Sequence, residues 1–135
     1  MPTQVRTEDL LKELAEISQS LRLIVEGLPL RMPTEMQVWS VYAGTEKTVA
    51  ILKFRLGAER PGVFSELPKF QRLADFLPVA LEKLTEATLK IEAEQLLEGL
   101  DTLRGARDNL RAYLSEERRV RMRAKRRAAA SRPSS

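Results

Sequence analysis

The chain contains no cysteine and no histidine. These absences exclude disulfides, thiolate nucleophiles, most zinc sites and the side chain that most often moves protons near neutral pH. The sequence also has no Gly-rich phosphate loop, no cluster of metal ligands and no nucleophile elbow. Its carboxylates fall mainly at helical spacing among Leu and Lys, as surface charges do. We therefore expect a protein that is not an enzyme and that uses no cofactor, no metal ion and no small-molecule substrate.

Long apolar runs are missing as well. No uninterrupted apolar run reaches 18 residues, so the sequence predicts no membrane partner. The first residues, MPTQVRTEDLL, lack the basic segment followed by an apolar segment that is typical of a secretory signal. We expect a cytoplasmic protein, associated with the nucleoid. A single Asn, no Cys and many Glu and Arg also fit a thermophilic protein.

The charge is distributed unevenly along the chain. Residues 1–103 carry 12 Lys and Arg against 16 Asp and Glu, a balance of −4, whereas residues 104–135 carry 11 against 3, a balance of +8. The end of the chain is therefore the basic part, although the net charge is only +4. Such a segment suits polyanions, with nucleic acid ahead of anionic lipid.

Residues 36–56 are the one stretch that is rich in β-branched and aromatic side chains. These types favour strands, and residues 43–47 (AGTEK) have the composition of a turn. The stretch therefore predicts a β-hairpin, with residues 28–33 as a candidate third strand. The expected fold class is α+β and mostly helical: a small antiparallel sheet packed with an N-terminal helix and followed by long C-terminal helices.

The predicted hairpin carries both aromatic rings and cations. Either register of the two strands sets Trp39 or Tyr42 beside Lys53 and Arg55, because alternate side chains share a face. Flat rings that stack on bases, flanked by cations that follow the phosphates, form the usual platform for single-stranded nucleic acid. The alternative interpretation is that both rings belong to the core and that the two cations solvate an exposed face.

The sequence before the hairpin predicts a helix. Thr7 is expected to cap it, with Glu8 and Asp9 in the first turn, where carboxylates complement the helix dipole. Gly27 suits the left-handed residue that ends a helix. Between these ends, one apolar stripe recurs at steps of three and four residues: Leu10, Leu11, Leu14, Ile17, Leu21, Ile24 and Val25.

Helix formers dominate after the hairpin. A second helix is expected from Ser65 through Phe76, followed by a break near Pro78, where a new helix starts. Residues 78–125 contain no further Pro, and one helix of that extent would be roughly 70 Å long, too long for the rest of the chain to cover. The segment must therefore fold back into a hairpin or pair with a second chain.

Leucines at heptad spacing favour pairing with a second chain. They predict a homodimer or homotetramer that is held by residues 89–114, and a monomeric helical hairpin is the alternative. Gly99 and Gly105 either mark a turn or let two helices approach closely. The candidate oligomerisation residues are Leu89, Leu96, Leu100, Leu103, Leu110 and Leu114.

These elements predict three parts. Residues 1–77 would form a compact nucleic-acid-binding domain of helix, β-hairpin and helix, and residues 78–126 a helical oligomerisation region. Residues 127–135 would be a basic flexible tail.

In this order of parts the chain resembles an archaeal family of single-stranded DNA-binding proteins, the ThermoDBP and ThermoDBP-related proteins. The residues that carry the resemblance are those of the aromatic and basic hairpin, residues 38–42 (VWSVY) and 51–56 (ILKFRL). The resemblance implies an apolar cleft edged by basic residues and assembly through the C-terminal part. The nucleic-acid-binding positions that it suggests are Trp39, Tyr42, Lys53, Phe54 and Arg55, with Lys47, Arg31 and Arg60 near the ends of the hairpin.

Three hypotheses follow for function. The first is a largely sequence-independent protein that binds single-stranded DNA, or RNA, through the aromatic and basic cleft. The second is an architectural protein that binds double-stranded DNA or RNA through the basic C-terminal arm. The third is a coiled-coil adaptor whose basic tail only keeps it soluble.

Overall fold

The computed structural model describes residues 6–57 and 72–131. This part of the chain forms four α-helices and a short 3-10 helix: α1 (Thr7–Glu26), α2 (Glu35–Leu56), η1 (Leu73–Asp75), α3 (Phe76–Glu92) and α4 (Leu96–Ala130). Within these residues there is no strand and no sheet. The predicted α+β fold is therefore wrong, and the protein is a helical bundle.

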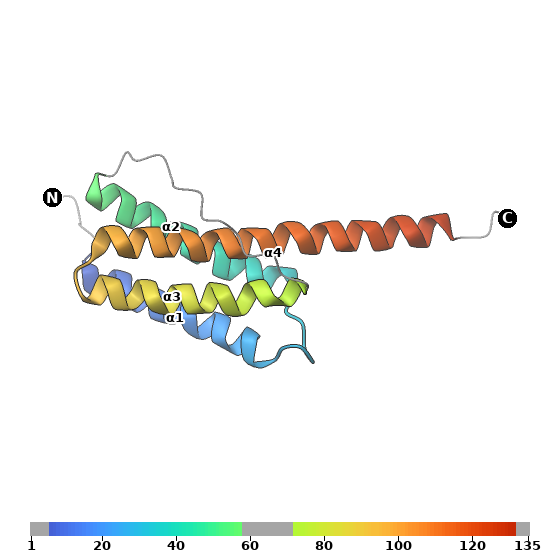
Figure 1. Cartoon of the computed structure of the whole chain (residues 1–135), viewed down its shortest axis with the longest axis horizontal. Helices are drawn as coiled ribbons and strands as arrows, with labels where there is room; N and C mark the ends of the chain where they lie inside the picture. The colour runs from blue at the N-terminus through green and yellow to red at the C-terminus, as the bar shows by residue number, and fades with distance from the viewer. Residues whose placement is uncertain (1–5, 58–71, 132–135) are drawn as a thin grey trace.

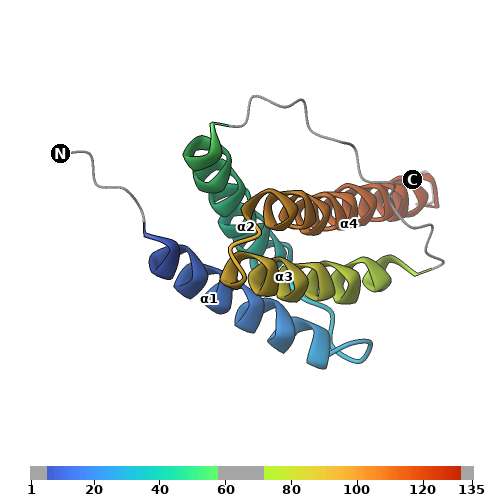
Figure 2. The same cartoon turned by 60° about the vertical axis from the view of Figure 1, so that its left-hand side comes forward.

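The four helices pack in the order α1, α2, α4, α3 around the bundle. Each helix contacts its two neighbours in this order, and the diagonal pairs do not touch. Figure 1 shows that α1 and α4 run one way while α2 and α3 run the other way, so that all neighbours are antiparallel. After a rotation of 60°, Figure 2 shows α4 lying against both α2 and α3. One end of the bundle therefore holds the end of α1 and the starts of α2 and α3.

Helix α2 occupies the stretch that was expected to be a β-hairpin. It starts with a capping box: the Thr34 hydroxyl accepts a hydrogen bond from the Gln37 amide, and the Gln37 side chain accepts one from the Thr34 amide. It ends at Gly57, whose φ of 59° is left-handed and suits glycine. Both ends of the segment therefore carry helix signals.

Burial in α2 follows a helical period and not the period of a strand. Its buried side chains recur at steps of three and four: Val38, Val41, Thr45, Thr48, Val49 and Leu52. Thr45 and Thr48 donate their hydroxyl hydrogen bonds to backbone carbonyls of their own helix, which satisfies both groups inside the core. Gly44, expected in a turn, lies where α1 crosses α2, and a Cβ there would come within 2.9 Å of Ile17 Cδ1.

The first helix agrees with its predicted stripe. Leu10, Leu14, Ile17 and Leu21 are buried, and Glu8 and Asp9 lie in the first turn. Its ends differ from the prediction, because Thr7 is already helical and Gly27 has a right-handed φ of −80°. Residues 27–30 form turns with a cis peptide bond before Pro29, so the candidate third strand is absent.

The C-terminal segment folds back on itself as a helical hairpin. Helix α3 ends at Glu92 and α4 begins at Leu96, with Glu94 at a positive φ of 61° in the turn between them. As expected, Pro78 lies in the first turn of a new helix. The two glycines lie at the contact between α3 and α4, because a Cβ on Gly99 would come within 2.7 Å of Ile91 and one on Gly105 within 3.0 Å of Lys83. They allow the two helices to approach closely.

Most of the leucines expected to pair with a second chain lie in the core of this chain. Leu96 is half-buried and Leu89 is 61% exposed, whereas four are buried: Leu100, Leu103, Leu110 and Leu114. The buried leucines are not available to a partner in this fold. The heptad spacing therefore also fits packing of α4 within one chain.

A single cluster of buried side chains draws on all four helices, on both sides of the domain boundary expected at residue 77. The expected flexible tail begins within α4, because residues 127–130 are helical. The helix expected from Ser65 to Phe76 lies largely outside the described residues. No helix in the described part of the chain is both long enough and apolar enough to span a membrane.

A candidate nucleic-acid interface on the α4 extension

The last part of α4 projects from the bundle, as Figure 1 shows. We define residues 115–130 as the α4 extension, because Leu114 is the last core residue of the helix. The extension is about 24 Å long at 1.5 Å per residue. Apart from Arg121, every residue from Arg118 to Ala130 is exposed. Most of this segment therefore touches only solvent.

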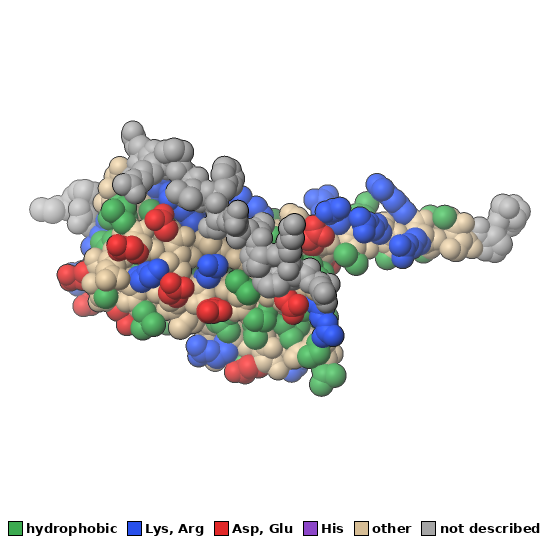
Figure 3. Space-filling view, in the orientation of Figure 1, with side chains coloured by type: hydrophobic (Ala, Val, Ile, Leu, Met, Phe, Trp, Pro, Cys, Tyr) green, Lys and Arg blue, Asp and Glu red, His purple; other side chains and the backbone are tan. Residues whose placement is uncertain are grey.

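The extension concentrates positive charge. Residues 118–127 contain seven Lys and Arg and no acidic residue. In Figure 3 the visible face of the body mixes Lys and Arg with carboxylates and apolar side chains, whereas Lys and Arg are the main charged side chains on the projecting extension. Arg119 pairs with Glu116 at 2.8 Å. The cations toward the tip, Arg123, Lys125, Arg126 and Arg127, form no ion pair with any described residue and are free to meet phosphates.

An ion pair ties the base of the extension to the start of α2. Arg121 Nη1 lies 2.6 Å from Glu35 Oε2, and Trp39 Nε1 donates a hydrogen bond of 3.3 Å to the other oxygen of the same carboxylate. The hydrogen bond from Arg121 lowers the pKa of Glu35, with a smaller contribution from Trp39 and from the nearby charge of Arg118. The same pair raises the pKa of Arg121. Trp39 and Arg121 thus share one carboxylate, and the charge of Arg118 acts on the same group.

The two rings predicted to bind bases, Trp39 and Tyr42, differ in solvent exposure and in their hydrogen bonds. Trp39 is 46% exposed, and its ring meets that of Tyr42 edge to face at a centroid distance of 5.4 Å. Tyr42 is half-buried, donates a hydrogen bond of 2.7 Å to Glu46, and accepts one of 3.0 Å from Arg111. The Arg111 guanidinium also lies 5.8 Å from the centroid of the Tyr42 ring. Of these two rings, Trp39 is the more exposed.

Glu46 is the centre of the polar contact between α2 and α4. Burial raises the pKa of its carboxyl, but the hydrogen bond from Tyr42 and the charges of Arg107 and Arg111 outweigh that effect, so the pKa is lowered. Arg107, which interrupts the apolar pattern of α4, lies 3.4 Å from Glu46. This network fixes Tyr42 as a structural residue.

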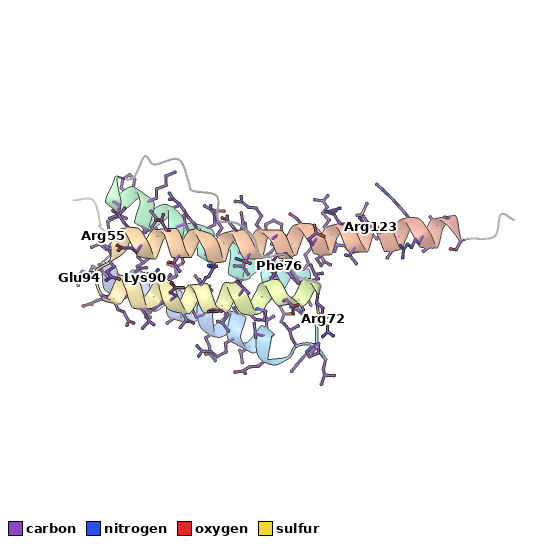
Figure 4. All side chains as sticks on the ribbon, in the orientation of Figure 1. Arg55, Arg72, Phe76, Lys90, Glu94 and Arg123 are labelled. Carbon is purple, nitrogen blue, oxygen red and sulfur yellow. The ribbon has the colours of Figure 1, made fainter. Side chains whose placement is uncertain are left out.

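The other expected binding residues of the hairpin lie at the opposite end of α2. Lys53, Phe54 and Arg55 are exposed, but they follow Trp39 by 14 to 16 residues, which is more than about 20 Å along a helix. Figure 4 shows Arg55 and Arg123 at opposite ends of the molecule. The Arg55 side chain donates a hydrogen bond to the Thr7 hydroxyl. The structure therefore does not bring these residues beside Trp39 or Tyr42.

The remaining expected binding residues are scattered. Lys47 is exposed and pairs with Glu13 of α1 at 3.1 Å. Arg31 is exposed on the connection between α1 and α2, at the edge of an apolar cavity. Arg60 lies outside the described residues. These three positions do not form one surface.

Sequence reasoning placed the binding residues in the hairpin and assigned no residue of the extension to the site. The signal was present, because the change from −4 to +8 along the chain marks the basic end. Helix was expected through residue 126, and the basic arm was the alternative binding element, but nothing in the sequence alone showed that residues 115–130 leave the bundle. Among the described residues no group of acidic side chains could hold a metal ion.

Comparisons of the chain with known protein families, with curated proteins and with solved structures find no match. The candidate interface is therefore argued from its own geometry and charge. The resemblance to the ThermoDBP proteins depended on a hairpin that is a helix in the structure, and membership of that family stays a prediction.

Proposed function

We propose that the protein binds nucleic acid through the α4 extension and that it has no catalytic role. The observation that carries the proposal is the run of seven cations without an acidic residue on a helix that projects from the body. Clustered Lys and Arg on an exposed helix supply the phosphate contacts that dominate affinity for nucleic acid. The location that this function implies is the nucleoid.

Duplex DNA is the form that best fits the shape of the extension. The major groove of B-DNA admits one α-helix, and exposed cations around that helix can reach phosphates on both sides of the groove. Residues 122–130 are exposed on every side, so no part of the body blocks their approach to a groove. The triple alanine at residues 128–130 keeps the tip narrow. We expect phosphate contacts and little sequence preference.

Two charge-matched variants test this proposal. The extension variant replaces Arg123, Lys125, Arg126 and Arg127 by Gln, and the body variant replaces Lys12, Arg22, Lys53 and Arg55 by Gln. Fluorescence anisotropy of a labelled duplex should show a loss of affinity of at least about tenfold for the extension variant, since four phosphate contacts are lost. The body variant should bind nearly as the wild type does. Equal losses in both variants would contradict the proposal.

Single-stranded DNA is a second candidate, and the exposure of Trp39 favours it. The indole and the Arg121 guanidinium share the carboxylate of Glu35, so a base that stacks on the ring could place its phosphate near that guanidinium. Of the two predicted rings only Trp39 is exposed, whereas single-strand platforms stack successive bases on several rings. This mode would therefore add one stacked base to the contacts of the extension.

Replacement of Trp39, the only Trp, separates the two modes. In the single-strand mode, oligo-dT quenches the Trp39 emission, and Trp39→Ala weakens binding of oligo-dT by about tenfold, as expected for one stacked base. In the duplex mode the same variant binds duplex DNA with unchanged affinity. Trp39→Phe is the control, because it keeps a ring at this position.

A further inference from the structure

A groove on the body carries negative charge and apolar surface together. It lies between the end of α1 and the outer face of α3, with a volume of about 580 Å³. Its apolar lining comes from Val25, Pro78, Leu81 and Leu89, and Leu89 is 61% exposed. The only charged side chains that line it are carboxylates, Glu82 and Glu86. We call it the α1–α3 groove.

One of the two carboxylates is free to pair. Glu86 lies 2.9 Å from Lys90 of its own helix. Glu82 is exposed and forms no ion pair with any described residue. A ligand of the groove should therefore combine apolar side chains with cations.

The α4 extension has that combination. Val120 is 54% exposed and shares one face of the helix with Arg123, Ala124 and Arg127, which follow it by three, four and seven residues. The lengths also match, because residues 78–89 of the groove span about 17 Å and residues 118–127 of the extension about 14 Å as helices. Apolar contacts would bury Leu89 while arginines pair with Glu82.

The extension of the same chain cannot reach this groove. It continues α4 as one helix directed away from the body, and the ion pair between Arg121 and Glu35 fixes its base. A second copy is therefore required. The groove contains the end of α1 and the start of α3, which lie at the end of the bundle from which the extension leaves. Two copies related by a two-fold axis can thus exchange extensions. Each copy then gives one extension and receives one, so the assembly is complete with two chains.

We propose that two chains form a symmetric dimer in which the α4 extension of each chain lies in the α1–α3 groove of the other. A second apolar cavity, of about 650 Å³ between α1 and α2, does not suit the extension. Its only charged lining residue is Arg31, which repels a basic helix. The charges therefore select the groove on α3. This interface differs from the heptad surface that the sequence predicts.

The test is the mass of the full chain in solution as a function of concentration. Light scattering should show a rise from 15.3 kDa toward twice that value. Glu82→Lys should weaken the dimer by at least about tenfold, because it turns attraction into repulsion. Glu16→Lys is the control: it makes the same change in net charge at an exposed position on α1 that forms no ion pair with a described residue. It should leave the dimer intact.

A second variant tests the apolar half of the interface. Val120→Ser keeps every charge and alters one exposed side chain, so the fold should be unaffected while the dimer weakens. Met122→Ser, on the opposite face of the helix, is the matched control and should leave the dimer intact. A wild-type mass of one chain at all concentrations would overturn the proposal, as would equal effects of Glu82→Lys and Glu16→Lys. The dimer and the nucleic-acid complex use the same helix, so the two forms exclude each other, and nucleic acid should shift the dimer toward single chains. Because Glu82 lies off the extension, a wild type that stays a single chain would overturn the dimer and leave the nucleic-acid proposal to its own test.

Discussion

Glu35 is the residue that connects the α4 extension to the bundle. Its carboxylate accepts hydrogen bonds from both Arg121 and Trp39. When a phosphate competes for Arg121, the carboxylate loses its strongest partner and the indole changes its surroundings. Trp39 is therefore a natural reporter of events at the base of the extension.

The lowered pKa of Glu35 predicts a pH dependence of that reporter. A carboxylate whose pKa is lowered by folding contributes stability above its usual value of 4.5 and loses that contribution as the pH falls through the lowered value. The emission of Trp39 should therefore stay constant above pH 4.5 and change below it, while circular dichroism shows the helices intact. Glu35→Gln should lack this step. The same step in both proteins would refute the role of Glu35.

Gly99 lies at the close contact between α3 and α4, where a larger side chain should be destabilising. A Cβ at this position would come within 2.7 Å of Ile91 Cγ1, which is part of the buried core. Overpacking should outweigh the helix propensity that alanine gains, so Gly99→Ala should lower the free energy of unfolding by about 1 kcal/mol. In Gly27→Ala the nearest atoms are 3.4 to 3.5 Å away, and the effect should be small. Urea denaturation of both variants gives the two free energies of unfolding. A larger loss for Gly99→Ala than for Gly27→Ala would show that close helix packing requires a glycine at position 99.

At the scale of the element, α2 shows where sequence reasoning failed and why. Strand propensity reflects how well β-branched and aromatic side chains fit a half-buried surface, and a buried helix offers such a surface too. The threonines of α2 meet their hydrogen-bonding needs inside the helix, and Gly44 serves a helix crossing instead of a turn. The steps of three and four along Val38, Val41, Thr45, Val49 and Leu52 could have predicted the helix, as could the capping box.

The capping box also gives a direct test of α2. Thr34→Ala removes the side chain that accepts the hydrogen bond of the Gln37 amide, so the free energy of unfolding should fall by about 1 kcal/mol. Thr85→Ala is the matched control, since Thr85 lies exposed within α3 and its hydroxyl only bonds the Leu81 carbonyl. It should leave stability nearly unchanged. If residues 34–37 do not start a helix, the two variants will be equally stable.

Other elements were predictable because their signals are local. The apolar stripe of α1 and the position of Pro78 in α3 depend only on neighbours in sequence. The heptad leucines of α4 left two outcomes open, because a helix packs against its own chain and against a second chain with the same periodicity. Only the fold shows that Leu103 and Leu110 are buried within one chain.

At the scale of the whole molecule, charge is separated along the long axis. Residues 92–101, at the turn between α3 and α4, carry four acidic residues and no basic one, whereas residues 118–127 carry seven basic residues and no acidic one. The two segments lie toward opposite ends of α4. Under the proposed function, this asymmetry along α4 would direct a polyanion toward the extension and away from the turn between α3 and α4.

The measurement that tests the central claim most directly is the salt dependence of duplex binding by the wild type and the extension variant. Each neutralised phosphate contributes about 0.9 to the slope of log affinity against log salt concentration. If the extension holds the duplex, replacing Arg123, Lys125, Arg126 and Arg127 should reduce the magnitude of that slope by roughly 3 to 4. An unchanged slope would mean that the phosphates are held elsewhere on the molecule.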